Sequence, residues 1–292
     1  TFPLQKEMLP ATKIDLTASR IGKYMVSNRL QLGGQSKVYL GFVIDEEQKK
    51  GEEKVAIKHQ RGKINSEQEA KINNEEEFYR TVKHPGICEI REIIVRQEKD
   101  IIDQYLILEY CPTDFFLLRE RGILLESVLD YLLQISEILS FIHQQGIIYR
   151  DLKLENLLLS TEGKVKLCDF GSISWPHKPY RAADFAGTTE YLPPEMILWH
   201  TNSYAHDIWS FGILIYEMLF QRSPFFDTSE ERIVDNILAG KWNIPHSKVP
   251  KEYLTLIEGC LQACPTQRLG WTEIRKSLLE LKDKKVDNLE NE

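Results

Sequence analysis

Short apolar runs separated by polar connections fill the first third of the chain. β-Branched and aromatic residues gather at positions 38–44, 55–58, 90–96 and 104–109, and each run has the length of one strand. Residues 64–82 interrupt this series with a charged, glutamate-rich stretch, as expected for a helix with a large solvated face. The pattern predicts a first region of strands with one main helix.

Helical spacing dominates the rest of the chain. Apolar residues of segment 126–144 recur at steps of three and four: Val128, Leu129, Leu132, Ile135, Ile138, Leu139 and Ile142. Gly146 follows as a stop signal for this helix. The same spacing predicts further helices in four segments: 205–220, 230–239, 252–261 and 272–281.

This change of pattern divides the chain into four parts. We expect a leader at residues 1–23, a strand-rich region at 24–110, a helical region at 111–281 and a polar, frayed tail at 282–292. Within the helical region, residues 171–194 contain Pro, Ser, Thr and Gly without an apolar period. Such a stretch predicts a long functional loop.

Composition narrows the classes of partner and compartment. The 292 residues carry a formal net charge of −7, which argues against nucleic acid as a partner because nucleic-acid-binding surfaces need clustered Lys and Arg. Five irregularly spaced cysteines predict free thiols in a reducing compartment, cytoplasmic or nuclear. No apolar stretch suits a signal peptide or a membrane-spanning helix.

A lysine at the end of an apolar strand is the first candidate for chemistry. Lys58 follows Val55-Ala56-Ile57, and Glu75 lies on the next expected helix. A Lys58–Glu75 ion pair would hold the ammonium in place for phosphate oxygens. Taken alone, the lysine is better explained as a solvated strand end. Glu75, with its neighbours Glu76 and Glu77, could equally form a solvated helix face.

The segment Tyr149–Asn156, with the sequence YRDLKLEN, is the strongest signal. Asp151 would accept the proton of an attacking hydroxyl, and Lys153 would stabilise the charge of a transferring phosphoryl group. Asn156 would bind Mg²⁺ through its amide oxygen, as would Asp169, which follows an apolar strand. A charged turn would explain the first segment alone, but not the Asp169-Phe170-Gly171 that comes eighteen residues after Asp151.

These segments resemble the signature set of the protein kinase family. The resemblance extends over residues 24–281 and includes the loop 187–195, which looks like the substrate-docking loop, and Arg268, which looks like the arginine that pairs with Glu195. It implies a bilobal α+β fold with a small antiparallel-sheet N-lobe and a larger, mostly helical C-lobe. It also implies ATP and Mg²⁺ as cofactors and protein substrates. The oligomeric state does not follow from it.

The resemblance further implies a role for individual residues. The implied catalytic residues are Lys58, Glu75, Asp151, Lys153 and Thr188, and the implied metal ligands are Asn156 and Asp169. The implied nucleotide contacts run from the phosphate loop to the adenine pocket: Leu30, Gly33, Gly34, Ser36, Val38, Ala56, Lys58, Leu108, Glu109, Cys111, Asp114, Glu155 and Leu158.

Subtype follows from the same resemblance. Lys153 and Thr188 are typical of Ser/Thr kinases, and Tyr149 before Arg-Asp is similar to the AGC group, which includes the cyclic-AMP-dependent kinase. The calcium/calmodulin-type group is the main alternative. Glu155 and Asp235 match positions that bind substrate arginines in basophilic relatives, so we expect basic residues near the phosphorylated Ser or Thr; a solvated role would explain Asp235 equally well.

Two other classes of function compete with an active Ser/Thr kinase. A pseudokinase would bind nucleotide or partners without catalysis, but such proteins usually lose Lys58, Asp151 or Asp169, which this chain retains together with Asn156. A small-molecule or lipid kinase would have no use for a polypeptide-docking loop at 187–195.

The chain also departs from the family pattern in two loops. Gln31 and Ser36 stand where the phosphate loop usually has glycine, and since glycine lets backbone amides approach phosphates, we expect weaker ATP binding. Asp184 stands where many relatives carry a phosphorylated threonine. Its single charge could partly replace the phosphate opposite Arg150, or it could be an ordinary solvated acid.

Overall fold

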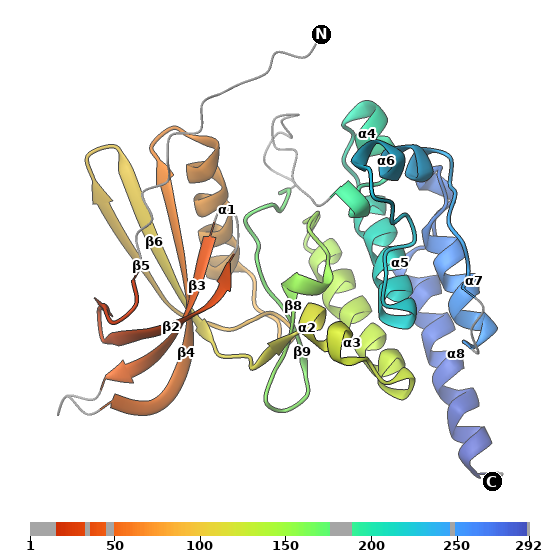
Figure 1. Cartoon of the computed structure of the whole chain (residues 1–292), viewed down its shortest axis with the longest axis horizontal. Helices are drawn as coiled ribbons and strands as arrows, with labels where there is room; N and C mark the ends of the chain where they lie inside the picture. Colours follow the sequence, from red (N-terminus) through yellow and green to blue (C-terminus); the bar gives the residue numbers. More distant parts are fainter. Residues whose placement is uncertain (1–15, 33–35, 45–49, 176–188, 246–248, 291–292) are drawn as a thin grey trace.

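The computed structural model describes residues 16–32, 36–44, 50–175, 189–245 and 249–290, which form two lobes (Figure 1). The first lobe is a sheet with one helix, and the second is mostly helical. The α+β, bilobal fold expected from the sequence is therefore confirmed.

An antiparallel sheet of six strands builds the first lobe, in the order β1-β2-β3-β4-β6-β5. Its strands are β1 (Arg20–Ile21), β2 (Tyr24–Leu32), β3 (Ser36–Ile44), β4 (Lys50–Lys63), β5 (Ile90–Glu98) and β6 (Ile101–Glu109). Strand β4 lies inside the sheet and places Lys58 opposite Val38 on β3 and Leu106 on β6. Lys58 therefore projects from backbone that is hydrogen-bonded on both sides.

Helix α1 (Glu67–Thr81) follows β4 and lies between the sheet and the second lobe (Figure 1). Ser66 caps its first turn by accepting a hydrogen bond from the backbone N–H of Glu69 at 3.2 Å. The expected solvated helix face exists, but Glu75 is not on it. Glu75 is buried on the inner face with Ile72 and Phe78, at the three-residue spacing that places side chains one above another.

The second lobe contains seven helices within the described ranges: α2 (Phe115–Arg121), α3 (Leu125–Gln144), α4 (Pro194–Trp199), α5 (Ala205–Phe220), α6 (Glu230–Leu238), α7 (Lys251–Cys260) and α8 (Trp271–Glu290). Three short strands, β7 (Thr113–Asp114), β8 (Leu157–Leu159) and β9 (Val165–Leu167), form a small sheet at the junction with the first lobe (Figure 1). None of the helices in these ranges is long and apolar enough to cross a membrane.

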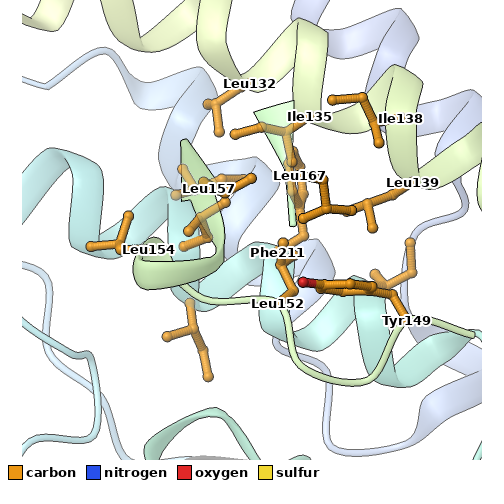
Figure 2. Close-up of a cluster of buried hydrophobic side chains, with 14 of the residues drawn as sticks. Leu132, Ile135, Ile138, Leu139, Tyr149, Leu152, Leu154, Leu157, Leu167 and Phe211 are labelled. Carbon is orange, nitrogen blue, oxygen red and sulfur yellow. The ribbon is translucent and has the colours of Figure 1, made fainter. Parts of the chain in front are cut away.

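Buried side chains of α3 hold the segment that follows it. Leu132, Ile135, Ile138 and Leu139 pack against residues of segment 149–157, of β9 and of α5: Tyr149, Leu152, Leu154, Leu157, Leu167 and Phe211 (Figure 2). Close packing of this kind leaves little freedom to the backbone. The polar residues between these anchors, including Asp151, are thereby presented from a rigid base.

The described residues of the leader and of the tail take part in regular structure that the sequence analysis did not predict. Leu16 is buried against the sheet and β1 pairs with β2, so the end of the leader packs on the first lobe. Helix α8 does not end at Leu281 but runs to Glu290. No Gly or Pro stops the helix there, and Lys284 forms an ion pair with Glu252 of α7 at 2.9 Å.

Candidate active site

A cleft between the lobes, about 940 Å³ including its open mouth, gathers most of the predicted site residues. Those that line it are Leu30, Ser36, Val38, Ala56, Lys58, Leu108, Glu109, Cys111, Asp114, Glu155, Asn156, Leu158 and Asp169. Tyr110, which belongs with Glu109 and Cys111 to the segment expected to contact adenine, lines it as well. The sequence analysis missed five more: Cys88, Pro112, Thr113, Leu117 and Cys168. Pro112, Thr113 and Cys168 adjoin a predicted residue in the chain, and this adjacency was the available signal.

Lys58, Glu75 and Asp169 meet at one side of this cleft. The Lys58 Nζ atom lies 2.8 Å from both carboxylate oxygens of Glu75 and 3.1 Å from Asp169 Oδ1. Burial alone would lower the pKa of Lys58, but the charges of Asp169 and Glu75 outweigh it and raise that pKa. For Asp169, burial is likewise outweighed by Lys58, so its pKa is lowered. Lysine and aspartate are both held in their charged forms.

Phe170 contacts both Glu75 and the aromatic residues that surround the cluster. Its backbone N–H donates to Glu75 Oε1 at 3.2 Å, and its ring stacks on Phe78 of α1 with centroids 3.8 Å apart. On its other side it meets the edge of Tyr149 at 5.5 Å. The aromatic contacts join α1 to the segment before Asp151, so the two halves of the site are packed as one unit.

Asp151, Lys153 and Asn156 form the second half of the site. Lys153 Nζ lies 2.9 and 3.0 Å from the Asp151 carboxylate oxygens, and Asn156 Nδ2 donates to Asp151 Oδ2 at 2.9 Å and to its backbone carbonyl at 2.7 Å. Burial raises the pKa of Asp151, and Lys153 opposes that rise. With its amide nitrogen engaged in this way, Asn156 keeps its oxygen for a ligand.

Asp207, at the start of α5, supports the backbone before Asp151. Its two oxygens accept from the N–H groups of Tyr149 and Arg150, each at 2.8 Å, and Arg150 has a φ of 70°. His143 Nδ1 accepts from Trp271 Nε1 at 2.8 Å, so His143 donates through Nε2 to Asp207 at 2.7 Å. The sequence analysis placed Asp207 only within the expected helix 205–220 and missed this network.

Two predicted nucleotide contacts also have structural partners. The Glu109 carboxylate accepts from Glu89 N–H at 2.7 Å and pairs with Lys166 at 2.8 Å, both through Oε1. The Glu109 backbone N–H donates to the Glu89 carbonyl at 2.9 Å. The Asp114 carboxylate caps α2 by accepting from Leu117 N–H at 2.7 Å. A contact of Asp114 with a ribose would have to share this carboxylate.

Part of the predicted site lies outside the described residues. Gly33 and Gly34 of the phosphate loop, Thr188 of the docking loop and Asp184 of the preceding loop belong to this group. The side chain of Gln31 does so as well. The phosphate-loop departure and the charge-replacement hypothesis for Asp184 therefore stay predictions.

The ion pair expected between Glu195 and Arg268 is confirmed. Two parallel contacts of 2.7 Å join the guanidinium to the carboxylate, and both side chains are almost fully buried. Glu195 lies on α4 and is the last residue of the docking loop. The pair therefore ties that end to the short turn before α8.

Acidic side chains gather beside the docking loop. Glu217 of α5 accepts a hydrogen bond from the Tyr191 hydroxyl and lies 3.6 Å from Arg119 of α2. Burial raises the pKa of Glu217 to about 7, against the effects of Tyr191 and Arg119, and the charges of Glu155 and Glu190 add to the rise. Glu155 therefore acts on this cluster.

Asp235 has a different environment from Glu155. It lies on the solvent-exposed surface of α6, whereas Glu155 lines the cleft and contributes to the acidic cluster around Glu217. Of the two acids predicted from the sequence to attract substrate arginines, Glu155 is the better placed.

Glu217 should make stability depend on pH. Because its pKa in the folded protein is about 7 against an ordinary 4.5, the folded state retains a proton that the unfolded state loses between these values. Stability from this residue is therefore complete below about pH 4.5 and is lost as pH rises through 7. Glutamine at position 217 does not titrate, so the variant avoids this loss. The free energy of unfolding of Glu217→Gln minus that of wild type should therefore be about 2–3 kcal/mol larger at pH 8 than at pH 4.5.

Urea unfolding of Glu217→Gln and wild type at both pH values would measure this difference. The exposed Glu258→Gln on α7 serves as the matched control and should show no such change. An equal effect of Glu217→Gln at the two pH values would contradict the assignment.

Comparison with known proteins agrees with this geometry. Residues 24–279 match the protein kinase domain. A "Protein kinase C-like" protein of Neurospora crassa is 30% identical over 275 residues, 91% of this chain and 23% of that protein. "Serine/threonine-protein kinase akt-1" of Caenorhabditis elegans is 41% identical over 136 residues, 45% of this chain and 24% of its own. "Ribosomal protein S6 kinase beta" of the same organism is 36% identical over 213 residues, which are 70% of this chain and 37% of that protein.

The chain thus spans about a quarter to two fifths of the length of these relatives. The similarity covers both halves of the site, because the matched domain begins before Lys58 and ends after Arg268.

Proposed function

Because the chain belongs to the protein kinase family, we propose that it is an AGC-like Ser/Thr protein kinase, which transfers the γ-phosphate of Mg-ATP to protein hydroxyls. The names of its relatives support the Ser/Thr type and the AGC-like resemblance. One observation carries the proposal. Lys58 and Asp169 of one cluster and Asn156 of the other line the same cleft, and Asp169 acts electrostatically on Asp151.

The donors in the cleft fit a divalent cation carried by a nucleotide. Asn156 and Asp169 both line the cleft, and amide and carboxylate oxygens are the ligands that Mg²⁺ prefers. Nowhere in the described ranges do three or more His, Cys, Asp or Glu side chains form a group that could hold a metal by itself. A cation held by these two residues would complete its shell with phosphate oxygens and water, as Mg²⁺ commonly does.

Each side chain then has a distinct task. When bound, Mg-ATP supplies the phosphoryl group together with a counter-charge for it. Lys58, fixed by Glu75, orients the α- and β-phosphate oxygens. Asp151 accepts the proton of the substrate hydroxyl. As it does so, the hydroxyl oxygen bonds to the γ-phosphorus and the bond between that phosphorus and the ADP oxygen breaks. Lys153 stabilises the negative charge of the phosphoryl group during the transfer. The burial that raises the pKa of Asp151 makes it a stronger base.

The acidic cluster around Glu217 supports basic peptides as substrates. Glu155 and Glu190 both act electrostatically on Glu217 beside the docking loop. Of these acids Glu155 lines the cleft, where a substrate arginine could bind its carboxylate through bidentate contacts. The five free cysteines support a reducing intracellular compartment as the place of action.

Transfer of labelled γ-phosphate from Mg-ATP to a positional Ser/Thr peptide array tests the function. Wild type should label Ser and Thr peptides, with stronger labelling where arginine precedes the acceptor, and Asp151→Ala should not. Transfer no greater than that of Asp151→Ala would overturn the kinase proposal. Equal labelling with and without arginine would remove only the basic preference.

A further inference from the structure

Two buried glutamines connect helix α1 to the sheet. Gln60 on β4 is 5% exposed and Gln104 on β6 is fully buried, and the two residues are paired directly across the neighbouring strands. An amide buried without hydrogen-bond partners costs about 1–3 kcal/mol. Glutamine at these two positions therefore needs an explanation beyond filling space.

Both glutamines use their amide nitrogens on consecutive residues of α1. Gln60 Nε2 donates to Glu75 Oε2, and Gln104 Nε2 donates to Glu76 Oε2 at 2.8 Å. The contacts look equivalent, but their targets differ. Glu75 holds Lys58, whereas Glu76 pairs with Arg80 on the outer part of the same helix.

Strand geometry explains why Gln60 reaches the site. Side chains two positions apart on a strand point to the same face, so Gln60 and Lys58 both face α1 while His59 points to the opposite side and stacks on Tyr105. Glu75 consequently accepts from Lys58 on both oxygens, from Gln60 on Oε2 and from Phe170 N–H on Oε1.

Opposing effects act on the ionisation of Glu75. Burial favours its protonated form, Lys58 opposes this, and the negative charge of Asp169 adds to the effect of burial, so the pKa of Glu75 is raised. Three other titratable groups feel the charge of Glu75: Tyr79, Tyr149 and Cys168. Burial raises the pKa of each of them well above its ordinary value, so they stay neutral near pH 7 and offer Glu75 no charge.

We propose that Gln60 is a positioning residue for phosphoryl transfer, because its amide keeps Glu75 ionised and docked on Lys58. A donor to a carboxylate favours its charged form, and an amide does so without titrating itself. Once Gln60 is lost, Glu75 takes up a proton at a higher pH. Asp169 is then the remaining carboxylate partner of Lys58. The position of the Lys58 ammonium relative to the nucleotide phosphates is consequently less well fixed. The inference rests on the proposed kinase function but concerns a contact that can be tested without catalysis.

The test compares Gln60→Leu with the matched control Gln104→Leu. Both variants remove a buried amide that donates to α1, but only the first touches Glu75. The dissociation constant of a fluorescent ATP analogue is measured for each variant between pH 5.5 and 8.5 and divided by that of wild type, so that titration of the nucleotide cancels.

For Gln60→Leu we expect binding to weaken as the pH falls, with the titration displaced to higher pH by about one unit, which is up to a tenfold loss at the acid end. Gln104→Leu should give a ratio independent of pH. Hydrogen–deuterium exchange of residues 67–81, compared at equal pH, should accelerate at pH 6 more in Gln60→Leu than in Gln104→Leu. Identical, pH-independent ratios for both variants would overturn the proposal and leave Gln60 with a packing role.

The substitution Gln60→Glu gives a second test with the opposite sign, and it serves if the leucine variant does not fold. The introduced carboxyl can donate to Glu75 only while it is protonated, so nucleotide binding should weaken as pH rises, in contrast to Gln60→Leu. Gln104→Glu is its control. An unchanged pH dependence in Gln60→Glu would likewise overturn the proposal.

These binding measurements separate the two hypotheses. Wild type that binds nucleotide with the expected variant behaviour but transfers no phosphate would contradict the kinase function and leave the role of Gln60 toward Glu75 standing. If wild type transfers phosphate but the Gln60 and Gln104 variants show the same pH dependence of nucleotide binding, the kinase function stands and the role of Gln60 is contradicted.

Discussion

Asp151→Asn should lower kcat by about 10³- to 10⁴-fold and change the KM for ATP by less than about threefold. Asparagine retains the shape of the side chain and an oxygen that can accept from Lys153 and Asn156, but it cannot take the proton of the substrate hydroxyl. Since Asp151 does not itself line the nucleotide cleft, the loss should fall on the chemical step. Steady-state kinetics would measure both constants, with the unphosphorylated form of a peptide that the array identifies as a substrate.

The change in charge needs its own control. Asp130→Asn removes an exposed carboxylate on α3 that lies 3.9 Å from Lys282, and it should leave kcat within about twofold, as for most exposed positions. Thermal unfolding of both variants would show that the fold is retained. A kcat for Asp151→Asn within tenfold of wild type would rule out its role as the proton acceptor.

Arg268→Met should reduce the free energy of unfolding by about 3–5 kcal/mol, the usual effect of breaking a buried ion pair by removing one partner. The guanidinium donates to Glu195 through two contacts of 2.7 Å and to the backbone carbonyls of Gln262 and Ala205 at 2.9 and 2.8 Å. It also lies over the ring of Trp209, 4.9 Å from the centroid. Removing it leaves the Glu195 carboxylate buried without its counter-charge.

Urea unfolding of Arg268→Met, Glu195→Leu and the double variant would measure the coupling. We expect the double variant to be clearly more stable than the sum of the single effects implies, because it leaves no unpaired charge in the interior. Arg275→Met, which breaks a 3.6 Å contact between partly exposed Arg275 and Glu137, should change stability by about 0.5 kcal/mol or less. A similar loss in Arg268→Met would show that the buried pair contributes little.

Local sequence patterns predicted β3 to β6, β9, α1, α3 and α5 to α8, because side chains on one face of an element recur at a fixed period. They assigned no element to the segments of β2, α2 and α4. They did not decide which glutamate of Glu75–Glu77 faces the lysine, although a helical count from Ile72 through Glu75 to Phe78 would have favoured the buried one. They also ended α8 too early, at Leu281, where the lack of a stop signal and a tertiary ion pair of Lys284 extend the helix.

The chain order and the chemical type of the proposed catalytic groups can be read from residues 58, 75, 151, 153, 156 and 169 alone, because each lies in a short motif with its own spacing. Folding was needed to show what holds them. Tyr149 and its acceptor Asp207 are 58 positions apart, and Trp271 and His143 are 128 apart, while Gln60 meets Glu75 only because a strand packs on a helix. Such partners have no fixed spacing, since they are chosen by how whole elements pack against one another.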